Sequence, residues 1–138
     1  MTSNSNTVQY CYLCDEGAAF TLYQTTFKDT DSIYSYNSAL TGGVFSLSQT
    51  TATLDTITVT NSYAVNGGVI NLYNNNPLSV KSSKFTTSVA ILNGGFAQFT
   101  NPSFNTIKFE VSITNSYFNS ISSGKNGGAM YISNENLN

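Results

Sequence analysis

Two short segments of this sequence contain side chains that could act in catalysis or bind a metal. The first is Asp29-Thr30-Asp31. Two carboxylates on one strand face can act as acid and base on a glycosidic bond, and with carbonyl oxygens they can hold Ca²⁺. This pair is the only one in the chain that alternation would place together on a strand face. The alternative is a solvated loop tip beside Ser32, and we expect that alternative.

The second segment is Cys11-x-x-Cys14. A closed zinc site needs four ligands, and two Cys without any His cannot supply them within one chain. A redox pair of this spacing is expected at a helix N-terminus beside a βαβ pattern, and no such pattern is present. We therefore expect a structural pair, either joined by a disulfide or belonging to the tail of a Cys-rich module.

The composition argues against most catalytic machinery. The chain has no His, and all five of its basic residues are Lys. It therefore lacks an imidazole base, a Ser or Cys triad and a guanidinium clamp. We predict that the protein is not an enzyme and uses no cofactor or metal.

The charge and hydropathy patterns restrict the partners. A net charge of −2 with five scattered Lys forms no basic face, so we expect no nucleic-acid partner. No apolar run approaches the roughly 18 residues of a transmembrane segment, so none is predicted. Residues 1–6 also lack the basic start and apolar core of a signal peptide.

Glycine pairs recur along the chain and indicate a solenoid. Gly17-Ala18 takes the place of the first pair, and the intervals between successive motifs are 25, 25, 27 and 33 residues, a period typical of repeat architectures. The full pairs are Gly42-Gly43, Gly67-Gly68, Gly94-Gly95 and Gly127-Gly128. Asn precedes the last three pairs, as Asn66, Asn93 and Asn126, and stacked asparagines can pass hydrogen bonds from one coil to the next.

The same alternation of apolar and polar residues follows every glycine motif. Side chains alternate across a strand, so one apolar set is predicted to share the inward face of a stack: Phe20, Leu22, Phe45, Leu47, Ile70, Leu72, Ala97, Phe99, Met130 and Ile132. A polar set falls between them and is predicted to face outward: Thr21, Ser46, Asn71, Gln98 and Tyr131.

A second unit recurs between the glycine motifs, with the form apolar, any, Asn/Ser, Ser, any, Phe/Ala. Its copies are 59–64, 80–85 and 113–118, which stack Val59, Val80 and Ile113. Alternation adds Ile57 and Val111 to the inward set. Residues 22–27 match loosely, so we expect segment 28–38 to be an inserted loop, and segment 100–108 to be another.

These patterns together predict an all-β, single-stranded parallel β-helix of about five coils of roughly 25 residues, because each unit can bury its apolar face only against the next. The alternative, a β-sandwich, gives no reason for Asn-Gly-Gly at this period. We assign residues 17–138 to the β-helix repeats, continuing beyond 138 or stacking on another copy. Residues 1–16 are assigned to an N-terminal strand or cap, or to a Cys-rich tail.

The segment Gly127-Gly128-Ala129-Met130-Tyr131 resembles the Gly-Gly-Ala-aliphatic motif of the chlamydial polymorphic outer-membrane proteins, and Tyr63-Ala64-Val65-Asn66 resembles their Phe-x-x-Asn motif. The resemblance covers roughly residues 17–132 and extends to pectin-lyase-like surface repeats of bacteria and protists. It implies a right-handed parallel β-helix at a cell surface, with an adhesive or structural role.

We therefore expect an extracellular or cell-surface scaffold that meets other protein chains, or copies of itself, through its ends and outer faces. Outward tyrosines also suggest glycans as partners: Tyr63, Tyr73, Tyr117 and Tyr131. Two alternatives remain open. One is a subunit of an end-to-end filament, because a heterologous contact that does not close continues indefinitely. The other is a polysaccharide-binding or polysaccharide-cleaving module that uses Asp29, Asp31 and surface tyrosines.

Overall fold

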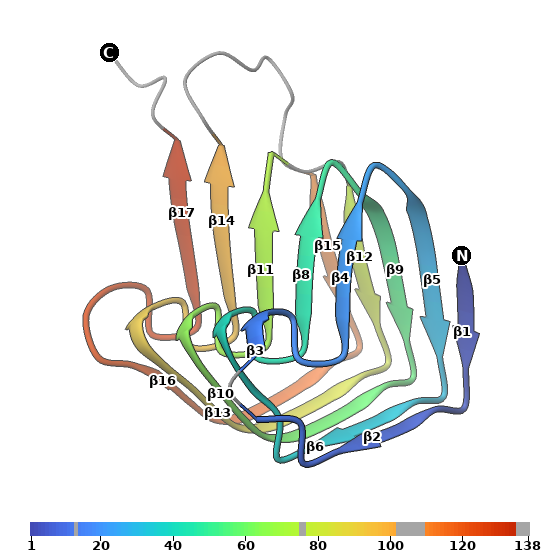
Figure 1. The fold of residues 1–138 in the computed structure, drawn as a ribbon, viewed down its shortest axis with the longest axis horizontal. Helices are drawn as coiled ribbons and strands as arrows, with labels where there is room; N and C mark the ends of the chain where they lie inside the picture. Colours follow the sequence, from blue (N-terminus) through green and yellow to red (C-terminus); the bar gives the residue numbers. More distant parts are fainter. Residues whose placement is uncertain (13, 75–76, 102–109, 135–138) are drawn as a thin grey trace.

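The computed structural model describes residues 1–12, 14–74, 77–101 and 110–134, and in that part of the chain it contains strands but no helix (Figure 1). The strands form three parallel sheets, which we call A, B and C. Sheet A consists of β1 (Thr2–Asn4), β5 (Thr26–Thr30), β9 (Thr51–Asp55), β12 (Leu78–Lys81) and β15 (Val111–Thr114).

Sheet B is the longest of the three and turns a corner. It consists of β2 (Thr7–Gln9), β6 (Ile33–Ser35), β10 (Thr58–Asn66), β13 (Lys84–Asn93) and β16 (Tyr117–Ser123), extended by β3 (Cys14–Glu16) and β7 (Ser38–Thr41). Sheet C consists of β4 (Phe20–Tyr23), β8 (Phe45–Ser48), β11 (Ile70–Tyr73), β14 (Ala97–Asn101) and β17 (Met130–Asn134).

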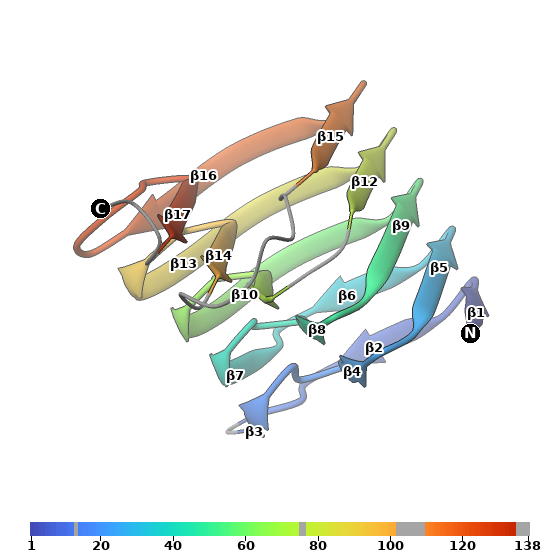
Figure 2. The same ribbon diagram turned by 90° about the horizontal axis from the view of Figure 1, so that it is seen from above.

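The chain runs through sheets A, B and C in turn and then returns to sheet A one level higher, as Figure 2 shows. Sheets A and C each have five strands, so the fold has five levels. Every strand pairs in parallel with the strand above or below it. The protein is a parallel β-helix, as predicted.

The first level begins earlier than the glycine motifs suggest. Segment 1–16, assigned from the sequence to an N-terminal strand or cap, or to a Cys-rich tail, supplies strands β1, β2 and β3, which pair with β5, β6 and β7. The expected loop over 28–38 is wrong, because these residues lie mainly in β5, β6 and β7. Polar corner residues interrupt the apolar pattern there. Of the second expected loop, residues 100 and 101 end β14, and residues 102–108 lie outside the described residues.

The core is a column of inward side chains from the three sheets. On sheet C, Phe45, Ile70 and Ala97 are in register at successive levels, and all three are fully buried. A second row in the same sheet follows the same pattern, with Leu47, Leu72 and Phe99 in register and buried. Each level therefore covers the apolar face of the one below it, which an isolated coil could not do.

The second repeat unit has a different register from the one expected. Val59 pairs with Phe85 and not with Val80, while Val80 pairs with Leu54 and with Ile113. The true equivalent of 80–85 is therefore 54–59, and the expected copy 59–64 is displaced by five residues. Val59 is nevertheless inward and fully buried, because it occupies the last apolar position of the same motif.

The five-residue displacement of the expected copy has a physical cause. Each coil turns two similar corners five residues apart, so their sequences look alike. The first corner has a left-handed residue, with φ between 49° and 57°, at Ser5, Asp31, Thr56, Ser82 and Asn115. The second corner lies five residues further on and repeats this conformation at Tyr10, Tyr36, Asn61, Thr87 and Ser120, with φ between 53° and 57°. A third series, at Gln24, Gln49 and Asn74, follows sheet C.

The last described level leaves its inward side chains uncovered. Met130 is in register with Ala97, and Ile132 with Phe99, yet they are 44% and 62% exposed. Val111, in register with Leu78, is 37% exposed. Ile113 is half-buried, as are Phe20 and Leu22 at the first level. The expected burial of these core positions is incomplete because they have a neighbouring coil on one side only.

Candidate functional site

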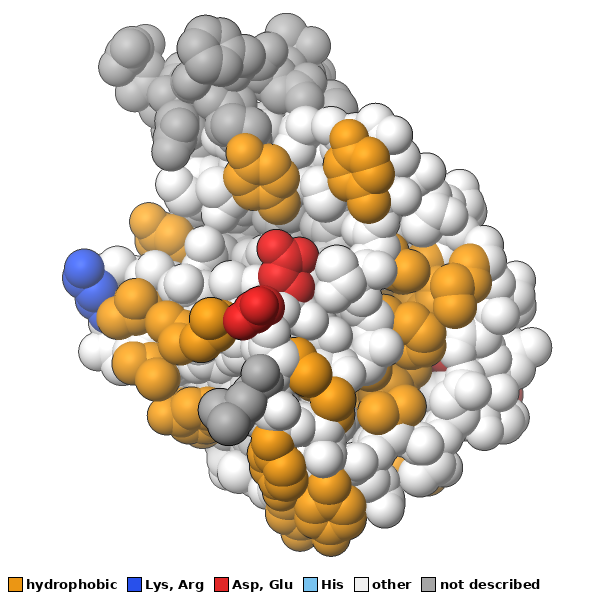
Figure 3. Space-filling model, viewed as in Figure 1, with side chains coloured by type: hydrophobic (Ala, Val, Ile, Leu, Met, Phe, Trp, Pro, Cys, Tyr) orange, Lys and Arg blue, Asp and Glu red, His pale blue; other side chains and the backbone are white. Residues whose placement is uncertain are grey.

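The outer face of sheet C carries a hollow surface that is distinct from the core. Figure 3 shows this face, where acidic side chains lie near the centre among neutral polar atoms and hydrophobic side chains form separate groups around them. Residues of β4, β8 and β11 that alternate with the buried positions point outward here. Along one row, Tyr23, Ser48 and Tyr73 are in register at three successive levels.

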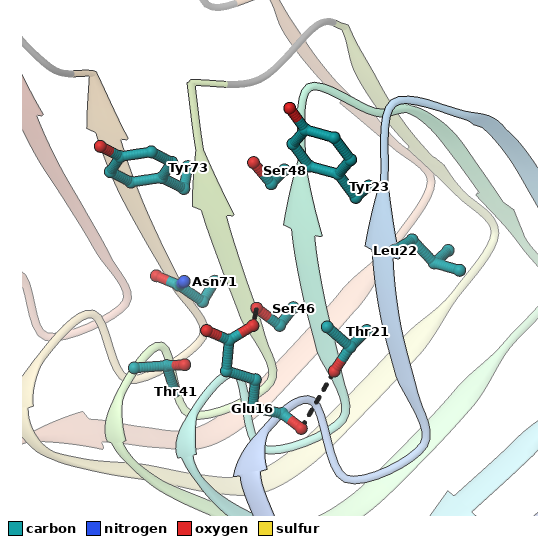
Figure 4. A pocket seen from close by; sticks show the side chains of 9 residues that line it. All are labelled: Glu16, Thr21, Leu22, Tyr23, Thr41, Ser46, Ser48, Asn71 and Tyr73. Atoms are coloured by element: carbon teal, nitrogen blue, oxygen red, sulfur yellow. Dashed lines mark hydrogen bonds between the residues drawn. The ribbon is translucent and has the colours of Figure 1, made fainter.

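The hollow is a shallow groove of about 420 Å³. Its walls come from sheet C and from the ends of β3 and β7, as the close-up in Figure 4 shows. The lining residues are Glu16, Thr21, Leu22, Tyr23, Thr41, Ser46, Ser48, Asn71 and Tyr73. Tyr23 and Tyr73 stand on either side of Ser48 (Figure 4), and they are 63% and 46% exposed. Two aromatic rings thus border a polar floor.

Glu16 holds the end of β3 against sheet C. The hydroxyl of Ser46 donates a hydrogen bond of 3.4 Å to Oε2 of Glu16, and the hydroxyl of Thr21 donates one of 3.1 Å to its backbone carbonyl (Figure 4). Glu16 is the one residue with a formal charge among the described residues that line the groove. The groove therefore has a negative end and no basic side chain in its lining.

The carboxylates of Asp29 and Asp31 are not brought together. Asp29 is in register with Leu54, points into the core and is fully buried. Asp31, in contrast, is exposed at a corner where the backbone is left-handed. The expectation of a shared strand face is wrong because β5 ends at Thr30 and the corner redirects the chain. The expectation of a solvated loop tip is wrong for Asp29.

Hydrogen bonds satisfy the buried carboxylate of Asp29. The hydroxyl of Ser32 donates to Oδ1 at 2.7 Å, and that of Tyr34 donates to Oδ2 at 2.6 Å. Burial, followed by the hydrogen bond to Asp29, raises the pKa of Tyr34 far above its ordinary value of 10.0. Buried polar groups are tolerated when they are paired in this way. The arrangement has the features of a structural network, since both side chains are enclosed in the core.

Cys11 and Cys14 lie at the second corner of the first level. Their Sγ atoms are 3.2 Å apart, and the thiols are unbridged. The hydrogen bond with Cys14, followed by burial, raises the pKa of Cys11 above its ordinary value. Both side chains are half-buried, and Tyr10 beside them stacks on Tyr36 with ring centroids 5.1 Å apart. The structure brings the pair into contact, and the disulfide stays a prediction.

The asparagines before the glycine pairs form a ladder. The side-chain amide of Asn93 donates to Oδ1 of Asn66 at 3.1 Å, and that of Asn126 donates to Oδ1 of Asn93 at 2.9 Å. At the two lower levels the same register position holds Thr41 and Glu16. The amide ladder therefore runs through the three upper levels. At the two lower levels, the residues at this position line the groove instead.

Each glycine of a pair has its own role. The first one adopts a left-handed conformation, with φ between 59° and 65° at Gly42, Gly67, Gly94 and Gly127. The second lies close to the coil above, since a Cβ on Gly43, Gly68 or Gly95 would lie 2.1–2.2 Å from the carbonyl oxygen of the next glycine pair. Gly128 differs, because its Cβ would meet nothing within 4 Å.

Glu16 and Tyr23 were missed as site residues, although the sequence contains signals for both. Glu16 precedes Gly17 as Asn66 precedes Gly67, and Tyr23 stands six residues after Gly17 as Tyr73 stands six after Gly67.

The other tyrosines that the sequence predicts to face outward do not line this groove. Tyr63 borders a smaller, more apolar hollow of about 280 Å³ on sheet B. Nζ of Lys84 lies over the ring of Tyr117, 6.0 Å from its centroid. Tyr131 is half-buried on β17.

Among the described residues, no group of three or more His, Cys, Asp or Glu side chains is arranged to hold a metal ion. In the same part of the chain, no helix is long and apolar enough to cross a membrane. Comparisons of the chain with protein-family models, with curated proteins and with solved structures each found no match.

Proposed function

We propose that the chain is a non-enzymatic β-helical scaffold of a cell surface or extracellular assembly, with a structural or adhesive role. The observation that carries the proposal is the in-register repetition of one coil over five levels. Such a stack exposes extended, regular outer faces, and solenoids commonly use these faces for binding. The outer face of sheet C has aromatic, hydroxyl and amide side chains in rows, which suits contact with a large partner.

A structural role is supported by the placement of the acidic residues. The one close pair of aspartates is divided between the core and the outside, so it offers no acid and base that face the same substrate. A glycosidase needs two carboxyl groups on opposite sides of one bond. Glu16 in the groove is accompanied by hydroxyl, amide and aromatic side chains only.

The cell-surface location rests on the resemblance of the Gly-Gly-Ala-aliphatic and aromatic-x-x-Asn motifs to those of chlamydial polymorphic outer-membrane proteins and pectin-lyase-like surface repeats. The parallel β-helix fits the fold that this resemblance implies. The test of location is immunogold labelling of thin sections of the source cells, where label confined to the cytoplasm would contradict the proposal.

A subunit of an end-to-end filament is a second candidate, favoured by the last described level. Met130, Ile132 and Val111 occupy inward register positions there and are substantially exposed. A further coil would cover them, whether it came from the same polypeptide or from another copy. An exposed edge of this kind favours strand addition.

The experiment that tests the scaffold role has two parts. Purified protein is incubated with neutral and acidic polysaccharides, and the release of reducing ends and of unsaturated uronates is measured. The proposal expects no release above that of a blank without protein. Electron microscopy and light scattering of the same sample then distinguish monomers from filaments with an axial repeat near a multiple of about 4.8 Å.

A further inference from the structure

We propose that the groove on the outer face of sheet C binds a neutral polysaccharide whose chain runs along the solenoid axis, across Tyr23, Ser48 and Tyr73. The proposal rests on the proposed scaffold function, because it names the class of partner that one outer face of the scaffold would bind. It assigns the binding to residues on the first three levels. Asp29 and Asp31, the acidic residues singled out from the sequence, take no part.

The spacing of the two tyrosines is the first argument. Neighbouring strands lie about 4.8 Å apart, so residues two levels apart in register are separated by about 9.6 Å. Tyr23 and Tyr73 are such residues, with the small side chain of Ser48 between them. In an extended polysaccharide, alternate sugar rings present the same face at a comparable distance, one disaccharide unit. Each tyrosine would support one ring, and Ser48 would leave room for the ring between.

Exposure of the two rings is the second argument. Tyr23 is 63% exposed and Tyr73 is 46% exposed, and each alternates with inward residues of its strand, which are half-buried in β4 and buried in β11. An aromatic ring buries a large area and has a polar hydroxyl at its tip. It can therefore pack against the C–H face of a sugar while the hydroxyl stays in water.

The floor of the groove supplies the polar contacts. Thr21, Ser46 and Asn71 form a second outward row in register. The hydroxyls of Thr21 and Ser46 already donate to Glu16, and Ser46 is buried. The polar contacts of this row therefore come from the exposed hydroxyl oxygen of Thr21 and from the half-buried amide of Asn71, which has donors and an acceptor for sugar hydroxyls. A volume of about 420 Å³ lies within the range of small-ligand sites, and the shallow shape suits a short stretch of a chain that continues beyond the groove at both ends.

Charge determines which polysaccharides fit. Glu16 is the one charged residue in the described lining, and no Lys accompanies it. Asp15 lies next to it in the sequence, and the whole chain has a net charge of −2. A uronate chain would bring carboxylates towards an acidic wall without a compensating cation, and like charges repel at this range. Neutral sugars avoid this cost, and a neutral hydroxyl can donate to the carboxylate of Glu16.

The test is titration of the isotope-labelled protein, followed by NMR, with cellohexaose, laminarihexaose, hexa-N-acetylchitohexaose and hexagalacturonate. We expect shift changes at β4, β8 and β11 with at least one of the three neutral oligosaccharides, and weaker or no binding of hexagalacturonate. Tyr23→Ala and Tyr73→Ala should each weaken binding about ten-fold, because each removes one aromatic support. Tyr117→Ala is the matched control, since Tyr117 is 54% exposed but belongs to β16 of sheet B.

Three results would overturn the proposal: no binding of any neutral oligosaccharide, equal or tighter binding of hexagalacturonate, or the same loss of affinity in Tyr117→Ala as in the groove variants. Circular dichroism of each variant shows whether it is folded, and Tyr23→Thr and Tyr73→Thr, which also remove the ring but favour strand conformation, replace any Ala variant that is not. The scaffold function fails separately, through the release of reducing ends or uronates. Loss of glycan binding without such release would reject this inference and leave the scaffold role in place.

Discussion

Tyr34 donates a hydrogen bond of 2.6 Å to Oδ2 of Asp29 inside the solenoid, where neither side chain is exposed. Along the stack, the position of Asp29 is taken by Ser3 at the first level and by Leu54, Val80 and Ile113 at the three levels above. The second level therefore has a carboxylate where the levels above it have an apolar side chain, and it supplies the donors from the same coil. A buried carboxylate of this kind stabilises the fold only as part of its network.

The network predicts a non-additive pair of substitutions. Asp29→Leu alone removes the acceptor of Tyr34 and should lower the free energy of unfolding by about 1–3 kcal/mol. The double variant Asp29→Leu/Tyr34→Phe removes both polar groups and should recover part of that loss, which urea denaturation would measure as a coupling energy. Asp31→Asn is the control, because Asp31 is exposed, and should change stability by no more than about 0.5 kcal/mol. Additive effects would contradict the network.

Tyr34 should also make stability depend on alkaline pH. Its pKa is raised in the folded protein above the ordinary value of 10.0, chiefly by burial. Above pH 10 the unfolded chain releases this proton while the folded one keeps it, so the stabilisation is complete below pH 10 and declines as the pH rises. The advantage of the wild type over Tyr34→Phe should fall by up to about 1.4 kcal/mol per pH unit above pH 10. Denaturation of both proteins between pH 8.5 and 11.5 tests this, and a constant difference would contradict it.

The second glycines of the pairs should differ in their tolerance of a methyl group. In Gly68→Ala the new Cβ would lie 2.1 Å from the carbonyl oxygen of Gly95 and 2.7 Å from Oγ of Ser88. The coils would have to separate, and we expect a loss of about 1–3 kcal/mol or more. Gly128→Ala is the matched control, since nothing lies within 4 Å of its Cβ, and should be neutral to within about 0.5 kcal/mol. Thermal unfolding of both variants decides the matter, and equal losses would refute close coil packing as the reason.

The amide ladder predicts a graded loss. Asn93 both donates to Asn66 and accepts from Asn126, whereas Asn126 makes one ladder bond and is exposed. Asn93→Ala should therefore cost about 1–2 kcal/mol and Asn126→Ala about 0.5–1 kcal/mol, at roughly 0.5–1.5 kcal/mol for each net hydrogen bond. Chemical denaturation measures both. A larger loss for Asn126→Ala would show that the ladder does not stabilise the upper levels.

Several features of the fold could be predicted because they are local. The period-two alternation after each glycine motif depends only on neighbouring residues, and it placed Phe45, Ile70 and Ala97 in one column. The glycine pairs recur because the corner needs a left-handed residue followed by one without a Cβ. Asn66, Asn93 and Asn126 repeat at the same point and form the expected ladder.

Other features needed the pairing of one level with the next. Thr56 and Asn61 turn similar corners five residues apart, so the motif that contains Val59 fits two registers equally well in sequence. Only contact with the coil above selects the pairing of Val59 with Phe85. Glu16 and Tyr73 are 57 positions apart in the chain, and stacking alone places them in one groove.

The sequence by itself determined the repeating coil, its inward residues and its glycine corners, since these depend on local conformation and alternation. The tertiary structure decided the first level, the register of the second unit and the interior position of Asp29. A polar residue at an inward position has the same sequence pattern as a loop until its partners are known. For Asp29 those partners are Ser32 and Tyr34, which reach it only when the corner at Asp31 has folded.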